Sequence, residues 1–66
     1  MQIQLNGTQK IFPQSLNLNE LIRSAGRANI PVIAELNGTI IPRGQWEALS
    51  LKEGDCIELV TLVGGG

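Results

Sequence analysis

The sequence ends in three consecutive glycines, Gly64–Gly66, and this end of the chain offers its most distinctive chemistry. Glycine has no Cβ, so the segment cannot pack against a core, and we expect it to stay flexible in solution. The last residue carries an α-carboxylate, which is ionised at neutral pH. Fully extended, three residues reach about 10 Å. A tail this slim can enter the active site of another protein, where its carboxylate can attack the α-phosphate of ATP and form an acyl adenylate.

The same glycines can also be a frayed end or a processing remnant without a role. The two interpretations differ in what they require of the remaining residues. A functional tail needs a compact module that presents it at a defined place.

Composition limits what that module can be. A chain of 66 residues makes one domain. Its single cysteine, Cys56, excludes an intramolecular disulfide and favours a reducing, intracellular setting. The sequence has no histidine, so no Cys/His cluster can form a structural zinc site, and we expect no metal or bound cofactor. The core must therefore consist of aliphatic side chains.

Charge and hydropathy exclude two classes of partner. The net charge is −1 and no basic cluster is present, which disfavours nucleic-acid binding. No apolar run approaches the roughly 20 residues that a membrane-spanning helix needs. The first residues lack the basic start and long apolar stretch of a signal peptide. We therefore expect a soluble, cytoplasmic protein with neither nucleic acid nor membrane as a partner.

Two hairpins are predicted from alternating polarity and turn chemistry. Residues 1–5 alternate apolar and polar side chains, and the pair Asn6-Gly7 favours a two-residue turn into a return strand over 8–12. The same Asn-Gly signal at positions 37–38 joins a buried strand over 32–36 to a short strand over 39–41.

A short helix is predicted between the hairpins. Asn17 is suited to cap it, and Glu20 three residues later completes a capping box. Gly26 is a natural stop. The i, i+3, i+4, i+7 spacing of one buried face is met by Leu18, Leu21, Ile22 and Ala25. A helix of about two turns is unstable alone, so it must dock on the sheet.

The final segment, residues 56–63, is the longest and most apolar strand, so we place it centrally in the sheet. Before it, residues 45–49 are predicted to form a single helical turn. This order of elements predicts a two-layer α+β fold, with one short helix on a mixed sheet of four to five strands. Residues 1–63 then form a single domain, and residues 64–66 its flexible functional tail.

Three features occur together in the order of a known family. The first is the pair Asn37-Gly38, followed by Ile40-Ile41-Pro42-Arg43 and then by Trp46. The second is Glu53-Gly54-Asp55, which comes before an Ile-Glu-Leu-Val strand. The third is the end of the chain, Gly65-Gly66. Over its whole length the sequence resembles the ubiquitin-like β-grasp sulfur carriers, and within them the ThiS family of thiamine biosynthesis.

The resemblance implies a protein that catalyses nothing itself. A ThiF-like adenylyltransferase would use ATP and Mg²⁺ to activate the carboxylate of Gly66, with no cofactor bound by this chain. Sulfur from a cysteine-derived persulfide would convert it to a thiocarboxylate, and a ThiG-like thiazole synthase would receive that sulfur. By the same resemblance Gly65 is the unhindered neighbour, and Gly64 adds tail length.

Other residues are candidates for contacts with partners. The last strand is apolar on both faces, so one face is expected to meet the helix and the other to remain partly open. On that second face Val60 and Leu62 are candidate contacts, and Glu58, two residues before Val60, is a candidate polar contact. An acidic rim could be formed by Glu47, Glu53 and Asp55. Cys56 and Trp46 are interpreted as packing residues rather than as functional groups.

Three other functions share the glycine tail. A carrier for molybdopterin synthesis has the same fold and end, a ubiquitin-like modifier would attach to lysines, and an interaction module would leave the glycines idle. An enzyme is not expected, because the sequence has no histidine, no evident pair of cleft carboxylates and no phosphate-binding loop.

Overall fold

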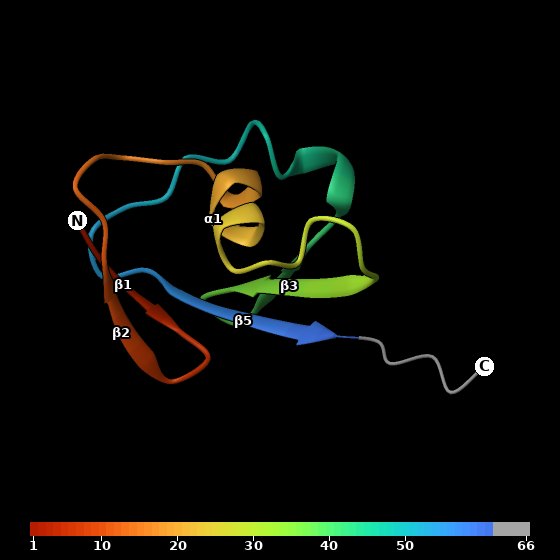
Figure 1. Ribbon diagram of the computed structural model, residues 1–66, viewed down its shortest axis with the longest axis horizontal. Helices are drawn as coiled ribbons and strands as arrows, with labels where there is room; N and C mark the ends of the chain where they lie inside the picture. The colour runs from red at the N-terminus through yellow and green to blue at the C-terminus, as the bar shows by residue number, and fades with distance from the viewer. Residues whose placement is uncertain (62–66) are drawn as a thin grey trace.

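The computed structural model describes residues 1–61, which form a five-stranded sheet with one helix packed on one of its faces (Figure 1). The helix α1 spans Leu18–Ser24, and a 3₁₀ turn, η1, spans Arg43–Gln45. The strands are β1 (Gln2–Leu5), β2 (Thr8–Ile11), β3 (Val32–Leu36), β4 (Thr39–Ile41) and β5 (Cys56–Thr61). Their order across the sheet is β2-β1-β5-β3-β4. The predicted α+β architecture is therefore confirmed.

The last strand lies in the centre of the sheet, as its apolar sequence predicted. On one side β5 pairs in parallel with β1. On the other it pairs antiparallel with β3, from Val32 opposite Thr61 to Leu36 opposite Ile57. The predicted continuation of this strand through residues 62–63 lies outside the described residues. The central strand thus joins the two hairpins into one sheet.

Both predicted hairpins are present, and both turns have the backbone that Asn-Gly pairs favour. The φ angles are 48° at Asn6 and 81° at Gly7, and 50° at Asn37 and 88° at Gly38. Positive φ at both central residues is the geometry of a type I′ turn, whose twist matches that of the flanking strands.

The helix begins and ends where its sequence signals predicted. Asn17 Oδ1 accepts a hydrogen bond from the Glu20 N–H at 2.8 Å, and the Asn17 N–H donates to Glu20 Oε1 at 2.8 Å, which completes the capping box. Gly26 follows the helix with a φ of 76°. The apolar face of α1 is buried in a single core made of Ile3, Leu18, Leu21, Ile22, Ala34, Trp46, Leu51, Ile57 and Leu59.

The helical turn predicted over residues 45–49 lies earlier, at Arg43–Gln45. Pro42 is its N-cap, and the fixed φ of proline starts the turn directly after it, with the Gln45 N–H donating to the Pro42 carbonyl at 2.9 Å. Trp46 follows, 5% exposed, and its indole N–H donates to the Ile41 carbonyl at 2.9 Å. The predicted packing role of Trp46 is confirmed.

The asparagines of the two turns also bind the central strand through their side chains. Asn6 Oδ1 accepts from the Leu59 N–H at 2.8 Å, and its Nδ2 donates to the Leu59 carbonyl at 3.3 Å. Asn37 Oδ1 accepts from the Cys56 N–H at 2.9 Å, and its Nδ2 donates to Asp55 Oδ1 at 3.1 Å. Each amide replaces backbone partners at the point where the neighbouring strand turns away from β5.

Residues 1–61 contain no helix long and apolar enough to cross a membrane. The longest helix there, α1, has 7 residues.

Replacing Asn6 by glycine tests the contribution of its side chain to the central strand. Glycine tolerates the positive φ of this position, so the turn survives while both bonds to Leu59 are lost. We expect Asn6→Gly to lower the free energy of unfolding by about 1–3 kcal/mol, measured by urea denaturation. Asn29 is an exposed asparagine in the loop before β3, and Asn29→Gly is therefore the matched control. Equal losses in both variants would show that the amide contributes nothing specific.

Candidate functional site

The sheet face opposite α1 carries the side chains of β5 that do not enter the core. Ile57 and Leu59 point to the helix side and are 0% and 7% exposed. Glu58 and Val60 alternate with them and are exposed, Val60 by 49%. The sequence-based choice of Glu58 and Val60 as the outer side of this strand agrees with the structure. Leu62, the third candidate, lies outside the described residues.

Three apolar side chains from three adjacent strands lie on this face. Ile33 of β3 is directly opposite Val60 of β5, and Ile40 of β4 is opposite Glu35 of β3. Ile33 is 37% exposed and Ile40 is 63% exposed. We call Ile33, Ile40 and Val60 the open-face patch. Exposed apolar side chains that are contiguous across neighbouring strands are typical of a contact surface.

Two glutamates lie on the same face as the open-face patch, on neighbouring strands. The register places Glu35 directly opposite Glu58 on neighbouring antiparallel strands. Like charges in such positions destabilise a sheet. The neighbouring strand positions on this face include Gln4, Ile33, Ile40, Cys56 and Val60, and none of these carries a positive charge. The arrangement therefore favours binding of a basic side chain from outside the chain.

Two carboxylates of the expected acidic rim have structural contacts. The two Asp55 carboxylate oxygens accept from the Lys52 N–H at 2.8 Å and from the Asn37 side chain at 3.1 Å. Both Glu53 oxygens accept from the Gln2 N–H at 3.1 Å. These two carboxylates fix the turn before β5, whereas Glu47 is exposed. Sequence reasoning missed Glu35, because only the strand register brings it opposite Glu58.

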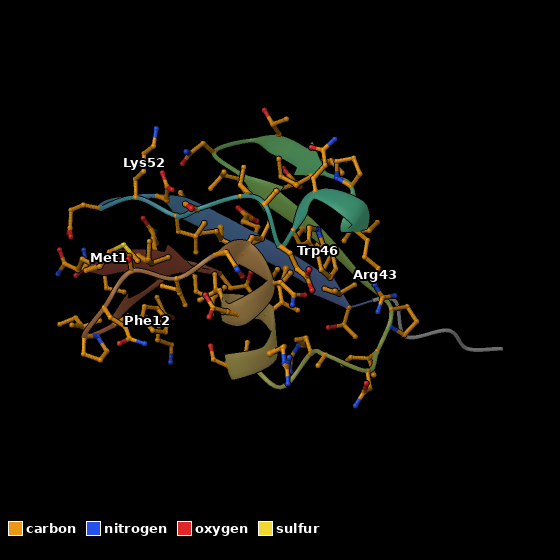
Figure 2. The ribbon with its side chains drawn as sticks, turned by 90° about the horizontal axis from the view of Figure 1, so that it is seen from above. Met1, Phe12, Arg43, Trp46 and Lys52 are labelled. Atoms are coloured by element: carbon orange, nitrogen blue, oxygen red, sulfur yellow. The ribbon has the colours of Figure 1, made fainter. Side chains whose placement is uncertain are left out.

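Arginines lie on the helix side of the sheet, near the end of β5. The Arg43 guanidinium carbon lies 5.8 Å from the centre of the Trp46 ring, within the range of a cation–π contact. Arg43 and Trp46 line a shallow pocket with Arg23 of α1. Figure 2 shows Arg43 and Trp46 at the end of the molecule toward which β5 runs, and Met1 and Phe12 at the other end. A cationic group thus lies at the same end of the molecule as the end of β5.

Cys56 opens β5 and is half-buried. Its N–H is bound by Asn37, and the register places it opposite Gln4 of β1. Within residues 1–61 no group of three or more His, Cys, Asp or Glu side chains is arranged to hold a metal ion.

The glycines that the sequence singled out, Gly64, Gly65 and Gly66, lie outside the described residues. The structure fixes the position from which they continue. Thr61, the last described residue, is paired with Val32 in the sheet. The glycines therefore follow, two residues further on, from the end of β5 that pairs with β3.

Comparisons with known proteins agree on one family. The family model described as the ThiS family matches residues 3–66. The crystal structure of a thiamine biosynthesis protein, ThiS, from Geobacter metallireducens superposes with a TM-score of 0.84 at 33% identity, over 100% of both chains.

Two relatives are much longer proteins. Proteins named thiazole synthase from Paramagnetospirillum magneticum and Magnetococcus marinus are 29% and 36% identical to this chain over 66 residues. The match covers 100% of this chain but only 20% of each relative. The chain therefore spans about a fifth of the length of these two proteins.

Removing one charge of the facing glutamates tests their repulsion. Glu58→Gln keeps the size of the side chain and relieves the contact with Glu35, so we expect the free energy of unfolding to rise by up to about 1 kcal/mol at neutral pH and low salt. Urea denaturation measures this, with Glu47→Gln as the control for a lone exposed glutamate. A gain no larger than that of the control would contradict the repulsion.

Proposed function

This chain belongs to the ThiS family, and from that premise we propose that it carries sulfur for thiamine biosynthesis as a thiocarboxylate on Gly66. One observation supports this most directly: the glycine tail continues from the central strand of the family's fold. Antiparallel pairing with β3 continues as far as Thr61, and a hydrogen-bonded strand end is a defined base from which a tail can be presented to a partner's active site.

The proposed chemistry takes place in partner enzymes. In a ThiF-like adenylyltransferase, a carboxylate oxygen of Gly66 attacks the α-phosphorus of Mg²⁺-bound ATP, which releases pyrophosphate and leaves an acyl adenylate. The terminal sulfur of a cysteine-derived persulfide then attacks the acyl carbon and displaces AMP. Attack by a second thiol on the resulting acyl disulfide leaves the thiocarboxylate and forms a disulfide. Gly65 has no side chain to obstruct these attacks.

A ThiG-like thiazole synthase is the proposed recipient of the sulfur. The two relatives named thiazole synthase each contain a segment that is similar to this entire chain. Two modules joined in one polypeptide are held at a high effective concentration relative to each other. We infer that this chain meets the same kind of enzyme by docking.

The open-face patch is the proposed docking surface for the adenylyltransferase. It combines three exposed isoleucine and valine side chains with the facing glutamates Glu35 and Glu58. A partner with an apolar centre and an arginine or lysine would cover the patch and neutralise the pair. Val60 and Glu58 lie on β5 itself, so docking here would also orient the strand that leads to the tail.

Intact-mass spectrometry tests the carrier function. After incubation with a ThiF-like adenylyltransferase, Mg²⁺, ATP and a persulfide source with reductant, we expect a mass gain equal to replacing one oxygen by sulfur. Deleting residues 65–66 should abolish the gain. Deleting Gly66 alone leaves a glycine end about 3.3 Å shorter, so its residual gain measures how much reach the partner's site requires. No gain with an enzyme that is active on another carrier of the family would refute the proposal.

Val60→Asp tests the docking surface. The substitution places a third carboxylate beside Glu35 and Glu58 and removes an apolar contact, so we expect affinity for the adenylyltransferase to fall by about ten- to a hundredfold. Calorimetric titration measures the affinity. Ile30→Asp, at a residue 39% exposed in the loop before β3, is the matched control and should bind normally. Normal binding by a folded Val60→Asp variant would place the docking surface elsewhere.

A further inference from the structure

A second surface lies on the opposite side of the sheet from the open-face patch. A groove of about 540 Å³ runs between β2 and the end of α1. Leu5, Phe12 and Leu59 contribute apolar side chains to its lining, and Lys10 and Arg27 contribute positive charge. Figure 2 shows Phe12 at the end of the molecule opposite to Arg43 and Trp46. This groove is therefore separate from the shallow pocket that Arg43 and Trp46 line.

The groove has a positive electrostatic character. Lys10 comes from β2 and Arg27 from the segment after α1, so the two cations reach it from different elements. Arg27 Nη1 donates to the Ala25 carbonyl at 3.1 Å, which holds its guanidinium against the end of the helix. None of the described residues that line the groove is acidic. The groove therefore suits an anionic ligand.

Within residues 1–61, the strand beside the groove has an edge with which no other strand pairs. β2 is the outermost strand on the N-terminal side of the sheet (Figure 1). Phe12 and Met1 exchange two hydrogen bonds, of 2.8 and 2.7 Å. Because bonded and non-bonded pairs alternate along an antiparallel ladder, the backbone N–H and C=O groups of Gln9 and Ile11 point away from β1. These groups are available to pair with an additional strand.

The side chains of β2 specify what such a strand would carry. Lys10 is opposite Ile3, a core residue, and so lies on the helix side of the sheet. Ile11 lies on the other side and is 76% exposed, the largest value among the exposed large apolar residues. A strand paired with β2 would therefore meet positive charge on one side and an apolar side chain on the other.

We propose that β2 and this groove bind an extended peptide segment of a partner protein, which adds as a strand to the edge of the sheet. Its acidic side chains face Lys10 and Arg27, and its apolar side chains alternate with them and contact Ile11. Main-chain hydrogen bonds to Gln9 and Ile11 supply affinity, and the alternation of acidic and apolar side chains along the peptide supplies specificity.

A second copy of this chain fits the edge less well. The only charged side chain of β2 is Lys10, so two β2 strands placed edge to edge would bring two positive charges together. The groove also lies across the sheet from the open-face patch. A peptide bound here leaves the docking surface for the adenylating enzyme accessible, and the proposed carrier function does not depend on it.

Nuclear magnetic resonance of the isotope-labelled full chain tests the proposal with two seven-residue peptides, one alternating valine with glutamate and one alternating valine with lysine. We expect the glutamate peptide to shift the amide signals of residues 8–12 and 24–27. It should also slow hydrogen exchange at the Gln9 and Ile11 amides, since these outward N–H groups become bonded. The lysine peptide should bind at least about tenfold more weakly.

Matched variants separate the backbone from the side chains. Ile11→Pro removes one outward N–H from an edge strand that tolerates proline, and should abolish binding. Ile11→Thr keeps that N–H and should weaken binding only a fewfold. Lys10→Glu with Arg27→Glu should reverse the preference between the peptides. Arg23→Glu with Lys52→Glu makes the same change in net charge away from the groove, and should preserve the preference.

Several results would overturn the proposal. These are the absence of shifts at residues 8–12 with millimolar glutamate peptide, equal binding of both peptides, and unchanged binding by a folded Ile11→Pro variant. Signal shifts that grow with protein concentration alone would identify a second copy as the occupant instead. The outcome is independent of the mass-gain experiment, because that experiment reports on the tail and uses no peptide.

Discussion

The structure depends on how β5 is held between two hairpins that are far apart in sequence. Parallel pairing with β1 covers only two residue pairs, whereas antiparallel pairing with β3 covers five. The side-chain amides of Asn6 and Asn37 extend both ladders past the points where the neighbouring strands turn. An unpaired backbone group next to the core is costly, so these two amides stabilise the central strand by bonding backbone groups of Cys56 and Leu59.

The consequence of this arrangement is a rigid base at the end of the described chain. With 66 residues and no disulfide, the module has only one small core, to which α1, Trp46 and the inner residues of β5 all contribute. Burial of Ile57 and Leu59 therefore stabilises the fold and fixes the strand that leads to the tail. Val60 and Glu58 alternate with them, so the same strand also forms the open surface.

The two sides of the sheet differ in charge. Glu35 and Glu58 face each other on the open side. Arg23, Arg27 and Lys10 lie on the helix side, and Arg43 is held over Trp46. Surfaces of opposite sign suit different partners, because electrostatic complementarity selects partners and orients their approach. The cost is the repulsion between the two glutamates, which a basic partner would relieve.

The sequence by itself determined the local elements and the class of fold. Asn-Gly pairs, the Asn17–Glu20 capping box and the period-two strands depend on neighbouring residues, so each was predictable, as was the central place of the apolar last strand. The spacing of Trp46 and Leu49 predicts a helical turn over residues 45–49, whereas the turn begins at Arg43, because the fixed φ of Pro42 sets its start. Only the tertiary structure decided that Glu35 meets Glu58, that Asn6 binds Leu59, and that Lys10 and Arg27 share a groove. These contacts join residues far apart in the chain, and strand register and helix docking set them rather than any local sequence preference.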